Sequence, residues 1–395
     1  MPENTTPQLA PKNRCTGCSA CASGCPKGAI HLLPDREGFL TPTVTDACIH
    51  CGHCTHICPV LKQREPRPEP TAFAVWNPDD ETRRLSSAGG VFSLLAQFIL
   101  DAGGVVCGAA MTDDLHVRHI VIQSKSELHR LRGAKLVQSE ISDTYVLVRR
   151  FLDRGLQVLF TGTPCQVDGL YRFLGEHPEK LLTCDILCGG VASPGVWEHL
   201  VHSMAYIKQK KPLSVSFCAK LDGEKDRRFR VSFEGGAAYD APLPKSEFGQ
   251  GIRRRLFLRQ SCHHCPYMSC DRVGDLSIGY YRGLPADFYP EEQKRGISLL
   301  LVNSAKGAHM FDTLPLKKEK RPLSEAVQGN IALSGPVAPS DERAAFFDAY
   351  AHQSFQQVRT RFLISSPLTQ VGRRKTPQTG SAKPSLWKKL FGKER

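Results

Sequence analysis

The 395-residue sequence predicts a small cysteine-rich unit, an α/β domain behind it and a basic tail. Three observations support this division. A run of four cysteines occurs twice near the N-terminus, strand and helix patterns alternate from residue 72 onward, and the composition turns polar and basic after Pro367. A chain of this length is expected to form two or three domains. Its hydrophobic content of 41% is enough for a sizeable core.

The two cysteine runs have the same spacing, four cysteines separated by two, two and three residues and followed by proline. The first run is Cys15, Cys18, Cys21 and Cys25 with Pro26, and the second is Cys48, Cys51, Cys54 and Cys58 with Pro59. Cysteines at this spacing ligate iron-sulfur clusters, and in two-cluster proteins the fourth cysteine of each run ligates the other cluster. The spacing therefore predicts two 4Fe-4S clusters, with Cys15, Cys18, Cys21 and Cys58 on one and Cys48, Cys51, Cys54 and Cys25 on the other.

Zinc and disulfides explain this spacing less well. A structural zinc takes its ligands as two separated pairs, whereas three cysteines at two-residue gaps surround one corner of a cubane. Disulfides are expected behind a secretory signal, and the start MPENTTPQLAPKNR has no apolar segment. The segment resembles the bacterial-type ferredoxin, a small holder of two clusters with two strands and two helices. The resemblance implies an α+β domain over residues 12–64 that stores and passes single electrons.

The apolar segments indicate neither a membrane span nor an exported protein. The longest of them, Gly89–Met111, is interrupted by Gln97, by Asp101 and by a glycine pair. Together with the polar start of the chain, this predicts a cytoplasmic protein.

Strand and helix patterns alternate behind the cysteine-rich unit. Residues 61–71, LKQREPRPEPT, are rich in proline and charge and predict an extended linker. The expected strands are 73–76, 105–111, 117–122 and the first half of 157–166, and the expected helices are 91–103 and 143–154. This alternation predicts an α/β domain.

Loops that follow strands in such a sheet are the places where ligands bind, and three of them carry suitable groups. Ser86–Gly90, SSAGG, opens the long helix and offers amides, hydroxyls and a helix dipole to a phosphate, although a plain helix cap explains it equally well. Leu131–Lys135, LRGAK, has two cations around a glycine, which suits a pyrophosphate, a flavin ring or a solvated turn. Thr161–Gln166, TGTPCQ, is a strand-to-helix turn that carries a cysteine.

Cysteines in later turns predict a further metal site. Four that can converge are Cys165, Cys188, Cys262 and Cys265. The residues alone favour a third cluster and a zinc site with His263 or His264 equally, and they also leave Cys165 as a nucleophile or core thiol. Cys184 and Cys270 lie near enough in sequence to replace one of the four, whereas Cys107 and Cys218 fit apolar strands and are expected to be core thiols.

Residues 72 to about 360 resemble the beta subunit of the coenzyme F420-reducing hydrogenases and dehydrogenases, a family of iron-sulfur flavoproteins. The similar segments occur in the family's order: SSAGGVFSLLAQFILDAGGVVCGAAM, LRGAKLVQSEISDTY, VLFTGTPCQVDGLYRFL, LLTCDILCGGVASPGVW and LFLRQSCHHCPYMSCDRVGDLSIGYYRG. The resemblance divides this part into an N-terminal-like segment, 72–150, and a C-terminal-like flavin and iron-sulfur segment, 151–365.

The resemblance implies an oxidoreductase with FAD, a third 4Fe-4S cluster and a hydride carrier such as coenzyme F420. A flavin suits this junction because it accepts two electrons together and releases them singly. The implied flavin-binding residues are Ser86, Ser87, Gly89, Gly90, Arg132, Gly133, Lys135, Thr161, Gly162 and Thr163. Cys165, Cys188, Cys262 and Cys265 match the family's cluster cysteines. Our own inference is that Lys135 acts catalytically by stabilising the reduced flavin anion.

The expected partners are therefore a one-electron carrier or redox protein on one side and a hydride carrier or small-molecule substrate on the other. Two alternatives remain open: a non-catalytic electron-transfer subunit that docks on a larger redox enzyme, and a flavin-free regulatory relative. The sequence departs from the family's pattern at Ala88 and at Gly279–Gly283, GYYRG, where the family has GDFWG. Arg282 in that segment favours an acidic partner or a ligand phosphate, or else lies on the surface.

The C-terminal part is predicted to hold one helix and a tail. Residues Pro339–Leu363 form the expected helix, which carries several aromatic side chains for docking. Residues 371–395 hold eight Lys or Arg and one Glu, so their net charge of +7 is more than half of the chain's +13. The basic tail, 366–395, ends in SLWKKLFGKER, which is either an amphipathic segment that docks on a membrane surface or protein groove or a disordered solubilising tail. No recognition motif accompanies the charge, so nucleic acid is not an expected partner.

Overall fold

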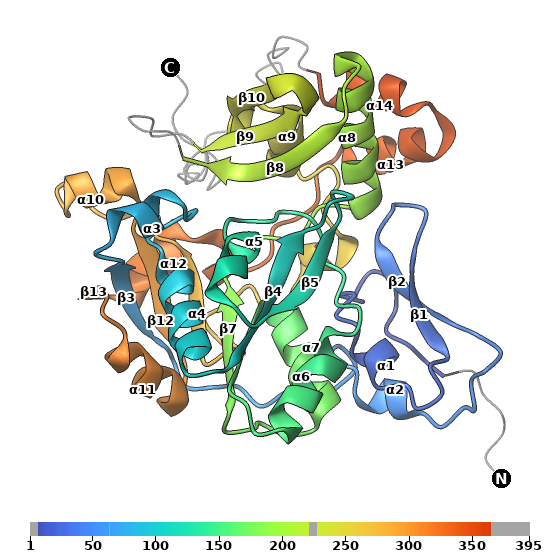
Figure 1. The fold of residues 1–395 in the computed structure, drawn as a ribbon. Helices are drawn as coiled ribbons and strands as arrows, with labels where there is room; N and C mark the ends of the chain where they lie inside the picture. The colour runs from blue at the N-terminus through green and yellow to red at the C-terminus, as the bar shows by residue number, and fades with distance from the viewer. Residues whose placement is uncertain (1–6, 63, 221–226, 365–395) are drawn as a thin grey trace, which may run out of the picture.

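The computed structural model describes residues 7–62, 64–220 and 227–364. Its strands form three sheets, of two, three and eight strands, which occupy separate regions of the molecule in Figure 1. The two-stranded unit, drawn in dark blue, lies beside the eight-stranded sheet, and the three-stranded sheet lies above it. The basic tail and the amphipathic segment expected within it lie outside the described residues.

The N-terminal unit has the two strands and two helices that the resemblance implies. Strands β1 (Ile30–Pro34) and β2 (Leu40–Val44) are antiparallel, with Ile30 opposite Val44. Helices α1 (Ala20–Ser23) and α2 (His53–His56) each follow a residue with positive φ, Ser19 and Gly52. Each helix carries the third cysteine of its run, so the sequence repeat is also a structural repeat.

The eight-stranded sheet has the order β13-β3-β12-β11-β7-β6-β4-β5. Its strands are β3 (Thr71–Trp76), β4 (Val105–Met111), β5 (Val117–Ile122), β6 (Val158–Gly162), β7 (Leu181–Ile186), β11 (Leu276–Tyr280), β12 (Ser298–Val302) and β13 (Lys317–Arg321). Strands β4, β6, β7 and β11 are parallel to one another. Strand β3 runs the same way, because β12 is antiparallel to both β3 and β11. Five strands therefore end at the same edge.

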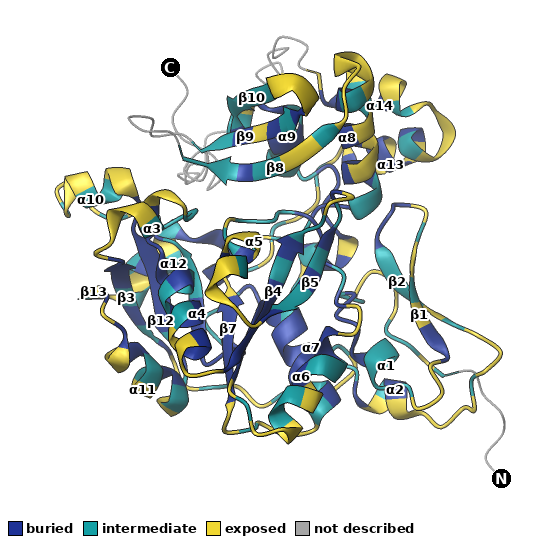
Figure 2. Cartoon of the chain, in the orientation of Figure 1, coloured by how far each residue is buried: buried dark blue, intermediate teal, exposed yellow. Residues whose placement is uncertain are grey.

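Helices cover both faces of this sheet, which explains why its central strands are mostly apolar, whereas the edge strand β13 is charged. Along β12, Leu300 packs into the core under α4 (Val91–Asp101) and α11 (Ala305–Thr313). Its neighbours Leu299 and Leu301 point to the other face, under α12 (Leu323–Gly329). Helices α6 (Thr144–Asp153) and α7 (Pro164–Leu174) cover the same second face further along the sheet. Figure 2 shows the buried residues concentrated in these central strands.

The sheet takes strands from both sides of residue 150. Strands β3, β4 and β5 come from residues 72–150, and the other five come from residues 151–365. The expected boundary between these segments therefore falls within one sheet and separates no two folded units. The expected linker, 61–71, is held on the surface by two arginines. Arg64 forms an ion pair with Asp271 at 2.6 Å, and Arg67 donates to the carbonyl oxygen of Gly274.

A three-stranded sheet that the sequence did not predict forms the remaining part. It consists of β8 (Pro212–Ala219), β9 (Arg228–Phe233) and β10 (Ala238–Pro242) in the order β10-β9-β8. The sheet packs with α8 (Pro194–Lys208) and α9 (Glu247–Arg253) around an aromatic core that includes Trp197 and Phe248. The other short helices are α3 (Asp80–Arg84), α5 (Leu128–Leu131) and α10 (Pro290–Arg295).

The single helix predicted for Pro339–Leu363 is wrong. The structure has two helices there, α13 (Arg343–His352) and α14 (Phe355–Phe362). Gln353 is extended, and Ser354 begins the second helix with a capping box in which Gln357 completes the hydrogen bonds. Such a cap satisfies amide groups at a helix start, so the break is built into the sequence. Among the described residues, no helix has the length and apolar character needed to cross a membrane.

Candidate functional site

The first set of cysteines, Cys15, Cys18, Cys21 and Cys58, surrounds one cavity of about 390 Å³. Cys58 comes from the second run, so the cavity has the crossed arrangement expected for a two-cluster unit. Burial and the neighbouring thiols raise the pKa of Cys21 to about 12. Thiols crowded in this way stay protonated on their own, because thiolates in close proximity repel one another. A bound cationic metal offsets that repulsion.

The second set, Cys25, Cys48, Cys51 and Cys54, lines a cavity of about 310 Å³. This set lies at the outer surface of the unit, where Cys51 is exposed and the adjacent Ile49 is 55% exposed. The interleaved histidines are exposed too, and the residues that line the cavity do not include them: His50, His53 and His56.

The third set, Cys165, Cys188, Cys262 and Cys265, is brought together from three separate segments. Cys165 lies in the first turn of α7, Cys188 follows β7, and the other two lie at the short helix Gln260–His264. The thiol of Cys188 interacts electrostatically with the other three. Burial and Cys262 raise the pKa of Cys165 to about 11, and burial and Cys165 raise that of Cys265 to about 12.

The alternative cysteines have other neighbours. Cys184 is fully buried within β7, where its thiol interacts with Asp185 and Asp275. Cys270 interacts with Glu69 and Arg272. Within the part of the chain that the structure describes, no three His, Cys, Asp or Glu side chains are arranged to hold a single metal ion. The first and second sets surround cavities, an arrangement that suits a multi-iron group.

The first and third sets adjoin each other. The thiols of Cys18 and Cys165 interact electrostatically. Gly169 of α7 permits this approach, since a Cβ atom there would lie 3.1 Å from the sulfur of Cys18. The hydroxyl of Tyr145 lies 2.8 Å from the carbonyl oxygen of Cys18 and 2.6 Å from that of Gln166. The N-terminal unit is therefore fixed where its nearer cysteine set contacts the large domain.

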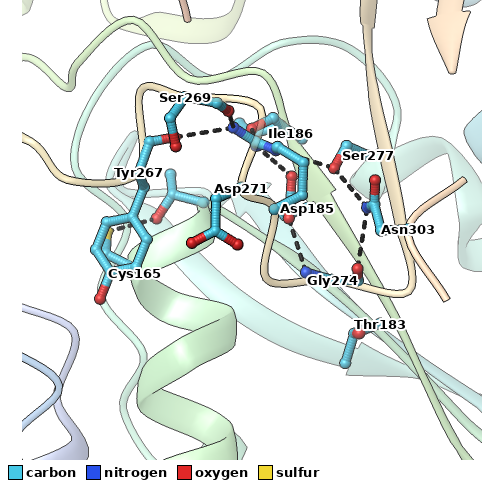
Figure 3. A network of polar contacts seen from close by, with 12 residues as sticks. Cys165, Thr183, Asp185, Ile186, Tyr267, Ser269, Asp271, Gly274, Ser277 and Asn303 are labelled. Atoms are coloured by element: carbon cyan, nitrogen blue, oxygen red, sulfur yellow. Dashed lines mark hydrogen bonds and ion pairs between the residues drawn. The ribbon is translucent and has the colours of Figure 1, made fainter. Parts of the chain in front are cut away.

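A buried ion pair supports the segments that carry Cys188 and Cys265. Arg272 and Asp185 are both almost fully buried and hydrogen-bonded to each other. The guanidinium of Arg272 also donates to the carbonyl oxygens of Tyr267 and Ser269 and to the hydroxyl of Ser277, as Figure 3 shows. Arg272 thus ties the loop that follows Cys265 to the end of β7.

The turns expected to bind flavin follow strands at the carboxyl edge of the sheet or lie close to them. Ser86–Gly90 follows β3, and Thr163 follows β6 as the cap of α7. The Arg132–Lys135 turn is connected to the first of these, because Arg132 Nε donates to Ser93 Oγ of α4 at 3.0 Å. Ligands of open α/β sheets bind at this edge.

The Ser86–Gly90 turn packs closely against β3. Gly89 has no room for a side chain, because a Cβ atom would lie 2.6 Å from the carbonyl oxygen of Val75. Gly90 has φ 82° and begins α4. At Ala88 the sequence departs from the family's pattern. The contact made there uses the backbone, because the Ala88 carbonyl oxygen accepts a hydrogen bond of 2.6 Å from Lys220 Nζ. These contacts account for both glycines by packing and backbone conformation.

The Arg132–Lys135 turn has an open side. Gly133 has φ 82°, and no atom lies within 4 Å of the position that its Cβ would take. The Lys135 ammonium donates to the carbonyl oxygens of Arg130 and Arg132. Burial lowers the pKa of Lys135 to about 7. The turn is therefore open beside Gly133, and its Lys135 amine is only partly protonated near neutral pH.

His119 connects Ser139 to Thr161 and Gly162. Its ring nitrogens lie 2.6 Å from Ser139 Oγ and 3.0 Å from the carbonyl oxygen of Thr161. A Cβ atom on Gly162 would lie 3.2 Å from Nε2 of His119. Sequence analysis missed His119, because a histidine inside an apolar strand pattern gives no local signal of its partners.

His119 predicts a specific loss of stability in acid. Burial lowers the pKa of His119 to about 4, below its ordinary value of 6.5. Between these pH values the unfolded chain binds a proton that the folded chain does not, so the free energy of unfolding falls as the pH falls, by about 3 kcal/mol in all. Denaturant unfolding at pH 7 and pH 5 measures about 2 kcal/mol of this loss. His119→Gln is expected to show a smaller loss, and equal losses in both proteins would contradict the prediction.

The remaining predicted residue, Arg282, lies at the carboxyl edge just after β11. Its guanidinium stacks at 5.3 Å from the ring of Tyr280, and that of Arg227 stacks on the same ring at 5.2 Å. Burial lowers the pKa of Arg282. Arg282 is therefore half-buried at the edge where ligands bind, close to a second cation.

Comparisons with known proteins agree with the two parts of the chain. Residues 155–321 match the family model for the C terminus of the coenzyme F420 hydrogenase/dehydrogenase beta subunit. Residues 14–61 match the 4Fe-4S dicluster domain. One similar solved structure is a chain of the F420-reducing NiFe hydrogenase complex from Methanosarcina barkeri, at 20% identity and a TM-score of 0.44, which covers 75% of this chain and 92% of that chain. No curated protein matches the sequence.

The fold, the cysteine sets and these matches define an iron-sulfur redox protein. More particularly, residues 155–321 are similar to the C terminus of the coenzyme F420 hydrogenase/dehydrogenase beta subunit, and residues 14–61 in front of them are similar to a 4Fe-4S dicluster domain. The resemblances predicted from the sequence are confirmed over these two ranges.

Proposed function

We propose that this protein is an oxidoreductase that passes electrons between a one-electron carrier protein and a two-electron carrier or substrate, using three 4Fe-4S clusters and FAD. The observation that carries the proposal is the third set of cysteines. It lies at the carboxyl edge of the sheet, adjoins the first set through Cys18 and Cys165, and contacts Thr163, one of the residues expected to bind flavin. The three sets thus form a continuous series from the outer surface to the ligand edge.

The residues present fit the proposed cofactors. Four thiols in one place provide the ligands of a cubane cluster. The guanidinium of Arg132 and the N-terminus of the 11-residue helix α4 suit a pyrophosphate. Bound flavin would supply the exchange between two-electron and one-electron chemistry, which hydride carriers and clusters cannot carry out with each other.

Each part of the site has its own proposed role. The second set is the most exposed and is the proposed point of exchange with the carrier protein. The Ser86–Gly90 and Arg132–Lys135 turns would hold the flavin, with the cation of Lys135 favouring its reduced, anionic form. Arg282 would favour an acidic carrier, and coenzyme F420 is one candidate that the family suggests.

The test is the content of iron, sulfide and flavin per chain in protein purified without oxygen. We expect about twelve iron atoms, since each cubane holds four, and one FAD. About eight iron atoms without FAD would reject the proposal and leave a ferredoxin joined to a domain of another use. A full cofactor content in a chain that reacts with no hydride carrier, but copurifies with a redox enzyme, would favour the electron-transfer subunit instead.

A further inference from the structure

Buried arginines in this protein are paired with carboxylates, with one exception. In the part of the chain that the structure describes, four arginines are less than 10% exposed: Arg83, Arg259, Arg272 and Arg343. Three of them form ion pairs, Arg83 with Glu292, Arg272 with Asp185 and Arg343 with Glu37. Within residues 7–62, 64–220 and 227–364, no carboxylate lies within ion-pair distance of Arg259.

The hydrogen bonds of Arg259 all go to neutral acceptors. Its Nε donates to the carbonyl oxygen of Cys15 at 2.9 Å. Its Nη1 donates to the carbonyl oxygen of Leu40 at 3.0 Å and to Oε1 of Gln138 at 3.1 Å. The guanidinium also stacks 5.4 Å from the ring centre of Phe39. A side chain that is 3% exposed therefore carries a full positive charge without a carboxylate to balance it.

Cysteine thiols are groups that can balance this charge. Arg259 interacts electrostatically with the thiols of Cys165 and Cys262 in the third set and opposes the rise that burial causes in the pKa of both. Its hydrogen bond to the Cys15 carbonyl oxygen connects it to the first set. Its own carbonyl oxygen accepts a hydrogen bond from the amide of Cys262. The guanidinium thus lies at the junction of the two sets.

Burial of a charge is costly unless an opposite charge lies nearby. Thiolate ligands of an iron-sulfur cluster are anionic, and the net charge of the cluster sets its reduction potential. We propose that Arg259 is the charge-compensating residue between the first and third sets, and that its positive charge raises the reduction potential of the third cluster and, less strongly, of the first. The inference rests on the proposed third cluster, but its contact with the first set is independent of it.

The second set provides an internal reference. Arg259 has no contact with it among the described residues, and Cys51 of this set is exposed. Reduction adds negative charge to a cluster, so loss of a nearby positive charge disfavours reduction. Removing the charge of Arg259 should therefore lower the reduction potential of the third cluster and leave that of the second cluster unchanged.

The experiment is a redox titration followed by electron paramagnetic resonance on the full, cluster-loaded chain, with Cys165→Ala used to assign the third signal. In Arg259→Gln we expect the ratio of reduced to oxidised third cluster, at fixed potential, to fall at least tenfold, which is 59 mV for one electron. In Arg259→Lys, which keeps the positive charge, the reduction potential of the third cluster should stay close to that of the wild type. Gln138→Glu places a carboxylate on the guanidinium and should lower the third potential with Arg259 still present.

A control tests the loss of a part-buried ion pair without a change of net charge. Glu247→Gln combined with Arg359→Gln removes a pair that contacts none of the cysteine sets and should leave the third potential unchanged relative to the second. The proposal is overturned if Arg259→Gln loads fully and its third and second potentials keep their wild-type separation. If that variant does not fold, Gln138→Glu decides in the same way.

Failure of the proposed function can be distinguished from failure of the inference about Arg259. Wild-type protein with about eight iron atoms would have no third cluster, whatever Arg259 does. In that case the inference is tested on the first ferredoxin cluster alone. If Gln138→Glu lowers the reduction potential of the first cluster relative to that of the second, the inference is supported. If the difference between these two potentials does not change, the inference is rejected.

Discussion

Replacing Cys165 with alanine is expected to remove about four of about twelve iron atoms per chain and to leave the ferredoxin pair intact. The physical reason is that Cys165 is held at the start of α7, where its thiol interacts with Cys262 and Cys265. Three remaining thiols leave one iron without a protein ligand. Iron analysis together with the paramagnetic signals of the reduced protein measures the loss.

The matched control is Cys184→Ala. Cys184 is a buried cysteine of the nearby strand β7, but its thiol neighbours are Asp185 and Asp275 rather than the third set. It is expected to keep all iron and to lose only some stability from the small cavity left behind. An unchanged iron content in Cys165→Ala, or an equal loss in both variants, would refute the assignment of Cys165 as a ligand.

The effect of Cys165→Ala on the neighbouring first set tests whether the first and third sites bind their clusters independently. Because Cys18 adjoins Cys165, loss of the third cluster removes a negative charge near the first set. We expect the first cluster to remain bound, since its four cysteines surround their own cavity and come from the N-terminal unit alone. Loss of about eight iron atoms would mean that the two sites assemble together, contrary to this expectation.

The sequence predicted those features that depend on residues close together in the chain. The cysteine runs fix their own geometry, because a two-residue gap places successive sulfurs around one centre. Strands β4, β5 and β6 were predicted within about a residue, since they are continuous apolar runs between turn signals. The third set was left open by the residues alone and was proposed from the family resemblance, because its four cysteines are spread over about 100 positions.

Features that depend on distant pairing were not predicted. Strands β11 and β12 lie between β3 and β7 in the sheet although they come much later in the chain, so no local pattern indicated that residues 72–150 and 151–365 share a sheet. The role of Arg259 depends on acceptors up to 244 residues away, such as Cys15. The break at Ser354 did have a local signal, a serine three residues before a glutamine.

Replacing Arg272 with methionine is expected to lower the free energy of unfolding by about 3–5 kcal/mol, the largest effect on stability that we predict. The change leaves the carboxylate of Asp185, which is fully buried, without its ion-pair partner. It also leaves the carbonyl oxygens of Tyr267 and Ser269 without a donor. Urea-induced unfolding of the full chain measures the change, and Figure 3 shows the network that it removes.

Two comparisons separate this effect from a general loss of charge. Lys294→Met breaks an exposed pair with Glu291 and should change the stability by less than about 1 kcal/mol. Adding Asp185→Leu to Arg272→Met should recover part of the loss, because the unpaired buried charge is then gone. If Arg272→Met unfolds at the same urea concentration as Lys294→Met, the buried pair contributes nothing.

The same substitution connects stability to the third set. Arg272 ties the loop that follows Cys265 to the end of β7, from which the chain continues to Cys188. We therefore expect Arg272→Met to release iron from the third site at lower urea than from the ferredoxin pair, whose cysteines lie in a separate unit. Release from all sites at one urea concentration would show instead that the whole chain unfolds as one unit and that this network has no local effect on the site.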